Sequence, residues 1–190
     1  GISIPVIIQR ISSISKNAKV IAVFSAPLTV VEGKRTSLTD VVLELGNRAK
    51  EGKISDLIIL EKTYEKILEL VSSEFQDECK KIIDDCLDKV KIELEKAMEK
   101  KEFSDEIRSK TLAYSGEILM SYIMEYILQS QGIRSKAVRL ENWPIITDNN
   151  IEYTNFVLSE SNKRIEHLEK LLGQNQVITI GGFIGRTTDG

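Results

Sequence analysis

Apolar positions follow a helical spacing in some parts of the chain and form short continuous runs in others. Residues 3–17, 38–50 and 159–172 place apolar side chains three or four positions apart, which predicts amphipathic helices. The runs at 20–25 and 177–180 are rich in β-branched residues and predict buried strands. Strands that alternate with helices predict a three-layer α/β/α sandwich with a mainly parallel sheet.

The middle of the chain has a different texture. Residues 51–106 are dense in Lys, Glu and Asp and poor in Gly and Pro. Helices are predicted at 55–72 and 73–101, each with an apolar stripe and a charged face. We interpret 51–106 as a charged helical insertion that packs on the α/β core and is a candidate dimerisation surface.

A further helix is predicted from Ser104 to about residue 131, and it is apolar nearly all round. Between residues 112 and 128 the only charged side chains are Glu117 and Glu125. Gly116 costs about 1 kcal/mol relative to Ala in a helix interior, so another group is expected to come close to it. A buried carboxylate needs a partner or stays protonated. Two interpretations of Glu117 stay open: it binds a ligand cation such as an ammonium, or it pairs with an internal Arg or Lys or faces water.

The predicted strand at 20–25 is followed by a predicted loop at 26–37. Thr36, Ser37 and Thr39 then surround the start of the next helix. Hydroxyl side chains at a helix N-terminus fit an anion-facing corner and equally fit ordinary N-capping. A short strand is also predicted at 137–140.

The last segment, residues 177–190, reads V-I-T-I-G-G-F-I-G-R-T-T-D-G. A strand here runs into a loop with glycines at 181, 182 and 185. Ligand atoms can approach the backbone N–H groups of glycine closely. The pattern alone fits a site for a phosphate or a small anion, and it also fits a tight turn.

Composition narrows the function classes. The chain has 190 residues, 42% of them hydrophobic and 29% charged, with a net charge of −3. This balance gives no electrostatic basis for binding nucleic acid or an anionic membrane. No apolar run approaches the ~20 residues of a membrane span, and no signal peptide is recognised, so we expect a cytoplasmic protein. Cys79 and Cys86 are expected to be reduced thiols on one helix face, and the single His167 argues against a zinc site.

Six short motifs are spread in order over most of the chain. They are G-I-S-I at 1–4, V-F-S-A at 23–26, T-D at 39–40, S-G-E-I-L at 115–119, I-T-D at 146–148 and G-F-I-G at 182–185. Their order and spacing resemble those of the aspartate kinases, in the amino-acid kinase superfamily. The first motif resembles the end of the family's K-F-G-G-T-S-V opening.

The resemblance implies an enzyme that transfers the γ-phosphoryl group of ATP, with Mg²⁺, to the side-chain carboxylate of L-aspartate. The product, 4-phospho-L-aspartate, leads to lysine, threonine and methionine. The resemblance also implies an amino-acid kinase-like fold, a homodimer, and residues 1–190 as a partial kinase domain, the amino-acid-binding lobe. In phosphoryl transfer the protein mainly positions the substrates and neutralises charge, so the absence of a candidate catalytic histidine fits this chemistry.

The resemblance also implies roles for individual residues. Glu117 would bind the substrate ammonium, and Ser25 and Thr39 would supply hydroxyls to the aspartate site. Gly182 and Phe183 would form a wall of that site, which replaces the phosphate-site interpretation of the glycine-rich end. Gly1 and Ser3 would belong to the phosphate-binding loop.

The sequence departs from the family pattern at several positions. The family's phosphate-contacting lysine precedes its first motif, and its substrate arginine lies in an R-G-G-S-D segment beyond the G-F-I-G loop. Neither is present in residues 1–190, so no catalytic residue is assigned and we expect this chain by itself to lack kinase activity. Ile2 stands where the family has Thr. The interval from Ser25 to Thr39 is longer than in the family, which leaves Thr29 as an alternative to Thr39.

Two other function classes stay open. The first is a non-catalytic amino-acid-binding or dimerisation module that works through the charged helices. The second is another amino-acid kinase, acting on glutamate, carbamate or a nucleotide. The G-E helix motif and the charged helical region favour aspartate.

Overall fold

The computed structural model describes residues 3–53, 56–151 and 153–190, so the prediction for Gly1 lies outside the described residues. The helices are α1 (Ile4–Ser15), α2 (Leu38–Lys50), α3 (Ile58–Leu68), α4 (Ser73–Lys100), α5 (Asp105–Ser115), α6 (Glu117–Gln129) and α7 (Leu158–Gln174), with a 3₁₀ turn η1 (Leu140–Asn142). The strands are β1 (Val20–Phe24), β2 (Leu28–Val31), β3 (Lys34–Ser37), β4 (Ser135–Ala137), β5 (Ile146–Thr147), β6 (Val177–Gly181) and β7 (Arg186–Thr187).

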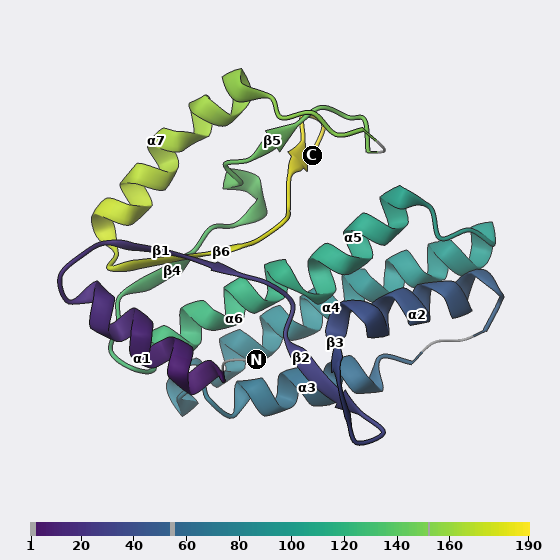
Figure 1. Ribbon diagram of the computed structural model, residues 1–190, viewed down its shortest axis with the longest axis horizontal. Helices are drawn as coiled ribbons and strands as arrows, with labels where there is room; N and C mark the ends of the chain where they lie inside the picture. The colour runs from purple at the N-terminus through teal and green to yellow at the C-terminus, as the bar shows by residue number, and fades with distance from the viewer. Residues whose placement is uncertain (1–2, 54–55, 152) are drawn as a thin grey trace.

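A three-stranded parallel sheet lies at the centre of this mixed α/β fold (Figure 1). Its order is β1-β6-β4, and Val177 of β6 lies between Val20 of β1 and Ser135 of β4. The predicted parallel sheet and both strand segments are therefore confirmed, and β6 is buried along its whole length, whereas β1 is buried only at Phe24. Because parallel strands carry their connections over the faces of the sheet, helices are expected on both sides.

Side chains of β6 point alternately towards α6 and towards α7. Thr179 donates a hydrogen bond from Oγ1 to the carbonyl oxygen of Ser121 on α6, at 2.7 Å. Ile178 and Ile180 point the other way and pack in a cluster with side chains of α7. Figure 1 shows α7 on one side of the strands and α1 and α6 on the other.

The outer face of β1 is not covered in the same way. Ile21 is 45% exposed and Val23 is 64% exposed, on the face that β6 presents to α7. The three-layer sandwich therefore stays a prediction for the sheet as a whole.

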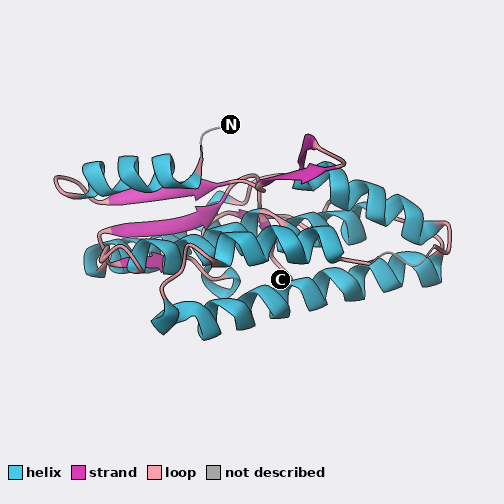
Figure 2. Cartoon of the chain, turned by 90° about the horizontal axis from the view of Figure 1, so that it is seen from below, coloured by secondary structure: helices cyan, strands magenta, loops and turns pink. Residues whose placement is uncertain are grey.

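The charged middle of the chain belongs to the main hydrophobic core. Helix α4 packs with α2, α3, α5 and α6, and Figure 2 shows helices of this bundle running side by side next to the strands. The predicted apolar stripe of α4 is confirmed, since Cys79, Ile83, Val90 and Leu94 are all buried. The division into a 1–190 lobe with a 51–106 insertion stays a prediction.

The single helix predicted from Ser104 to residue 131 is wrong. The chain breaks at Gly116, where φ is −125° and ψ is −96°, so that α5 and α6 are separate helices. A Cβ atom at Gly116 would lie 2.9 Å from the Cβ of Ala26, so the loop after β1 comes too close for any other residue. The expectation that some group approaches Gly116 is confirmed, and Ala26 makes this approach at the break between the two helices.

The loop predicted at 26–37 is also wrong, because most of it forms the antiparallel hairpin β2–β3. Glu32 and Gly33 make a two-residue turn with φ values of 48° and 78°, the geometry that suits a tight hairpin. An E-G pair is a weaker hairpin signal than N-G or D-G, so the sequence pattern did not predict the hairpin. The strand predicted at 137–140 lies instead at β4, and α7 begins at Leu158, one residue before the predicted cap.

Among the described residues, no helix combines the length and the apolar character needed to cross a membrane.

The two cysteines should be inert in the native protein. Cys79 and Cys86 are free and buried, and burial raises the pKa of Cys79 to about 12 and that of Cys86 to about 11. The thiolate is the reactive form, so at pH 8 a disulfide reagent such as DTNB should react slowly with the folded protein. Both thiols should react at once in guanidinium chloride. Rapid stoichiometric reaction of the native protein would contradict this packing.

Candidate functional site

The candidate site lies at the edge of the sheet where β1 and β6 both end. Parallel strands finish at the same edge, which is where α/β proteins place their ligands. The backbone N–H of Gly182 donates a hydrogen bond to the carbonyl oxygen of Phe24 at 2.7 Å. The loops after the two strands are therefore joined, and Ser25 and Gly182 lie at the same edge of the sheet.

The start of α6 touches both strand ends. Gly116 lies against Ala26, and a Cβ atom at Gly181 would lie 3.0 Å from the Cβ and backbone of Glu117. Two glycines thus allow the helix N-terminus to sit directly on the sheet edge. The partial positive charge of a helix N-terminus favours a carboxylate there, and Glu117 is the first residue of α6.

The Glu117 carboxylate is half-buried and lacks a positive partner. Burial raises the pKa of Glu117, while hydrogen bonds with backbone groups of Glu117 itself and Ala26 lower it and so limit the rise. In the described part of the chain, no Lys, Arg or His forms an ion pair with Glu117 (the ion pairs there all involve other acids). A partly desolvated carboxylate in this position can accept an ammonium from a ligand.

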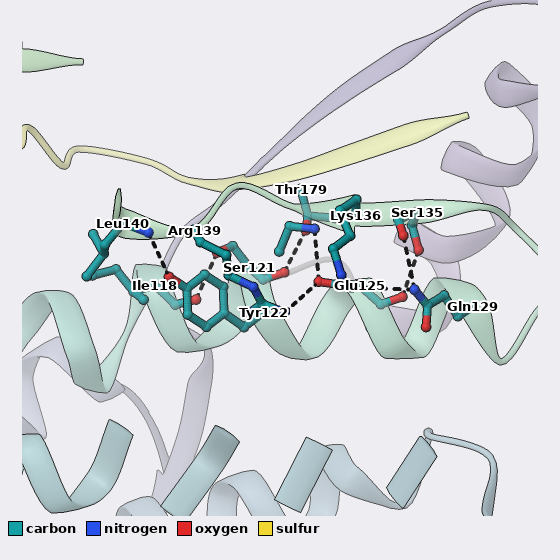
Figure 3. Close-up of polar contacts among 11 residues, drawn as sticks. Ile118, Ser121, Tyr122, Glu125, Gln129, Ser135, Lys136, Arg139, Leu140 and Thr179 are labelled. Carbon is teal, nitrogen blue, oxygen red and sulfur yellow. Dashed lines mark hydrogen bonds and ion pairs between the residues drawn. The ribbon is translucent and has the colours of Figure 1, made fainter. Parts of the chain in front are cut away.

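Glu125, on the same helix, is the acid that pairs internally. It is 1% exposed, and its carboxylate lies 2.9 Å from Lys136 Nζ and 2.9 Å from Arg139 Nη2 (Figure 3). The backbone N–H of Ala137 donates to it at 3.0 Å, and the Arg139 guanidinium lies 4.2 Å from the centre of the Tyr122 ring. The internal pair that the sequence left open for Glu117 is thus found at Glu125 instead.

Thr39 lies at the start of α2, next to the loop that follows Ser25. The backbone N–H of Leu38 donates to the carbonyl oxygen of Pro27 at 3.1 Å, which ties the helix start to this loop. Ser37 acts as the N-cap, accepting a hydrogen bond from the Thr39 N–H at 3.2 Å. N-capping is thus present at this corner, and the Thr39 hydroxyl makes no hydrogen bond to another described residue.

Thr29, the alternative to Thr39, lies on the hairpin and faces α3. Its Oγ1 is 2.6 Å from Oγ1 of Thr63, which donates to the carbonyl oxygen of Ile59 at 2.6 Å. The Thr63 proton is used in that second bond, so the Thr29 hydroxyl is the donor in the first. The Thr29 hydroxyl therefore has a hydrogen-bond partner, whereas the Thr39 hydroxyl has none among the described residues.

An open groove of about 1050 Å³ runs between α1, the β2–β3 hairpin and α3. Ser3, Ser25 and Thr29 line it, whereas Glu117, Thr39, Gly182 and Phe183 do not. Its charged lining residues are Glu32 and the cations Arg35, Lys62 and Lys66. None of these cations takes part in an ion pair within the described ranges. Ser3 and Ser25 thus share one groove, and Glu117 and Gly182 lie on the adjoining sheet edge.

Two of the sequence motifs are packed against each other near this edge. A Cβ atom at Gly185 would lie 2.5 Å from Cγ2 of Thr147, so the I-T-D and G-F-I-G segments are in contact. Trp143 is fully buried and donates a hydrogen bond from Nε1 to the carbonyl oxygen of Ile184 at 3.0 Å. Phe183 itself is fully exposed and has a φ of 55°, a conformation that favours glycine.

The described residues contain no group of three or more His, Cys, Asp or Glu side chains that could hold a metal ion.

Comparisons with known proteins identify solved structures with a similar fold. No family model matches the chain, and no curated protein sequence matches it. Two solved structures of aspartokinase III from E. coli do match, one in complex with lysine and aspartate (T-state) and one with aspartate and ADP (R-state). Each has a TM-score of 0.72 and 15% sequence identity over 96% of this chain. The chain spans 39% and 38% of those chains, and it has the fold of that part of aspartokinase III.

The two acids of α6 should respond oppositely to neutralisation. Glu125→Gln leaves Lys136 and Arg139 beside a neutral amide and should lower the free energy of unfolding by about 3 kcal/mol. Glu117→Gln should leave the protein at least as stable as the wild type at pH 7, because a partly desolvated charge is removed. Urea unfolding of the two variants at pH 7 measures both effects, and equal losses would contradict the distinction.

The pH dependence of the free energy of unfolding tests the direction of the Glu117 effect. Because the folded-state pKa of Glu117 is raised, its contribution to stability is fully present below the unfolded pKa and is lost as the pH rises through the folded pKa. The advantage of Glu117→Gln over the wild type should therefore shrink as the pH is lowered through that range.

Proposed function

We propose that this chain is the amino-acid-binding lobe of an aspartate kinase, an enzyme that phosphorylates the side-chain carboxylate of L-aspartate with ATP. One observation carries the proposal. In a fold like that of aspartokinase III, an acid without a cationic partner lies half-buried where β1 and β6 end. The ammonium group of aspartate would supply a cationic partner for this carboxylate.

The groups around Glu117 suit the two carboxylates of aspartate. Ser25 offers a hydroxyl beside the loop that bonds Glu117, and Gly182 lies on the neighbouring loop. The start of α2 adds the free Thr39 hydroxyl and the positive end of a helix. Hydroxyl and backbone donors that surround an anion in this way give charge-assisted hydrogen bonds, which are the strong kind.

The groove beside the site suits an anionic co-substrate. Its three cations, which have no ion-pair partner among the described residues, outnumber the single acid Glu32, so the groove attracts negatively charged ligands such as ATP or ADP. Ser3 lies in this groove at the N-terminus of α1, where the resemblance places the phosphate-binding loop. Mg²⁺ would arrive on the phosphates and neutralise their charge, since such ions are usually held through substrate phosphates.

The role of these residues is to bind and orient the two substrates. A carboxylate nucleophile needs no strong base, so alignment and charge neutralisation supply the catalysis. We assign no residue of the chain to direct contact with the transferring phosphoryl group. Phe183, strained and exposed, would form the site wall with Gly182. We further propose that the enzyme is a cytoplasmic homodimer. Its reaction would be the first step towards lysine, threonine and methionine.

Aspartate binding with an ammonium at Glu117 is directly measurable. L-aspartate should shift the NMR resonances of Ser25, Glu117 and Gly182, whereas succinate, which lacks only the ammonium, should bind roughly 10- to 100-fold more weakly. Glu117→Gln should remove the preference for aspartate over succinate. Glu166→Gln, on the exposed face of α7, is the matched control and should keep that preference.

Two outcomes would reject this assignment. If aspartate causes no shifts at the sheet edge, the chain is not an aspartate-binding lobe and the non-catalytic module is favoured. If Glu117→Gln binds aspartate and succinate with the wild-type ratio, the ammonium binds elsewhere.

The two threonines can be separated by a matched pair of substitutions. Thr39→Val removes a hydroxyl with no partner in the described protein, so it should weaken aspartate binding roughly tenfold with little loss of stability. Thr29→Val removes the bond to Thr63 and should lower the melting temperature while aspartate affinity is kept. Calorimetric titration and thermal unfolding report the two effects, and the reverse pattern would assign the site to Thr29.

A further inference from the structure

The break between α5 and α6 leaves backbone carbonyls that need partners. The last four carbonyls of a helix have no intrahelical donor. At the end of α5, the Ser115 hydroxyl bonds the Leu112 carbonyl oxygen at 3.2 Å. Ser115 itself is buried, and its carbonyl immediately precedes Gly116, the residue before the start of α6 at Glu117.

Tyr64 of α3 supplies the missing donor. Its hydroxyl donates to the carbonyl oxygen of Ser115 at 2.5 Å, and its side chain is completely buried. Burial raises the pKa of Tyr64 well above its ordinary value, and the negative charge of Glu117 adds to that rise. Tyr64 therefore stays protonated at neutral pH and can act as the donor.

The start of α6 has three restraints, and they differ in kind. The contacts of Gly116 with Ala26 and of Gly181 with Glu117 are steric and set how close the helix can come. The Tyr64 bond is polar and comes from a third direction, through α3. Without it, the Ser115 carbonyl would be buried and unsatisfied, a state that favours relaxation of the break.

We propose that Tyr64 is a positioning residue for Glu117: its hydrogen bond to Ser115 fixes the helix break that presents the Glu117 carboxylate at the sheet edge. The effect of Tyr64 on aspartate binding rests on the proposed function. Its effect on Glu117 does not, because that can be measured without any ligand.

Tyr64→Phe keeps the ring and removes only the hydroxyl. The expected results are a pKa of Glu117 that moves back towards the ordinary glutamate value, as the site opens to water, and an aspartate Kd that is roughly tenfold weaker. A ¹³C-detected titration of the Glu117 carboxyl group gives the pKa in the 190-residue chain.

Tyr122→Phe is the matched control. The Tyr122 hydroxyl is also largely buried and accepts a hydrogen bond from the backbone N–H of Leu140 at 3.2 Å. Its loss should lower the melting temperature and leave the pKa of Glu117 unchanged. A melting temperature that falls in Tyr64→Phe with the Glu117 pKa unmoved would overturn the proposal, since Tyr64 would then be only structural.

The outcomes distinguish this proposal from the proposed function. If the wild-type protein binds no aspartate, the proposed function is rejected, and the pKa comparison still decides the role of Tyr64.

If Tyr64→Phe does not fold, the wild type provides the test. Its Tyr64 hydroxyl proton should exchange slowly and show a nuclear Overhauser contact with the Gly116 amide. A rapidly exchanging hydroxyl without that contact would overturn the proposal.

Discussion

The close contact between the start of α6 and the ends of β1 and β6 is the constraint on which the rest of the site depends. Gly116 and Gly181 make this contact sterically allowed, and the Gly182–Phe24 hydrogen bond joins the two strand loops beneath it. The chain breaks between α5 and α6 at this contact, and Glu117 is the first residue of the new helix. Packing at one sheet edge thereby places a carboxylate where ligands bind in α/β proteins.

Glu117 and Glu125 lie on one helix, and only one of them is paired inside the described protein. Glu125 is surrounded by Lys136, Arg139 and a backbone N–H, so its charge is balanced. No described cation forms an ion pair with Glu117, and burial acts against its charge. Such an uncompensated group lowers stability, and under the proposed function the ammonium of a ligand would recover that loss. This difference is why we propose Glu117, and not Glu125, as the substrate-binding acid.

The sequence was most informative where periodicity was strong and tertiary contacts agreed with it. β6, α2 and the apolar stripe of α4 follow directly from their patterns. The helix break could not be predicted, because glycine costs only about 1 kcal/mol in a helix and the contact with Ala26 decides the outcome. The partners of Glu125 arrive from β4 and the segment after it, so spacing along α6 could not distinguish Glu125 from Glu117. Ser25 and Gly182 came together because parallel strands end at one edge.

A crystal structure of the chain with bound L-aspartate would test the role of Glu117 most directly. We expect the ammonium of aspartate within hydrogen-bond distance of the Glu117 carboxylate. We also expect its two carboxylates to face Ser25, Gly182 and the start of α2. Aspartate bound away from this edge, or bound there with its ammonium directed away from Glu117, would show that Glu117 is not the ammonium-binding residue.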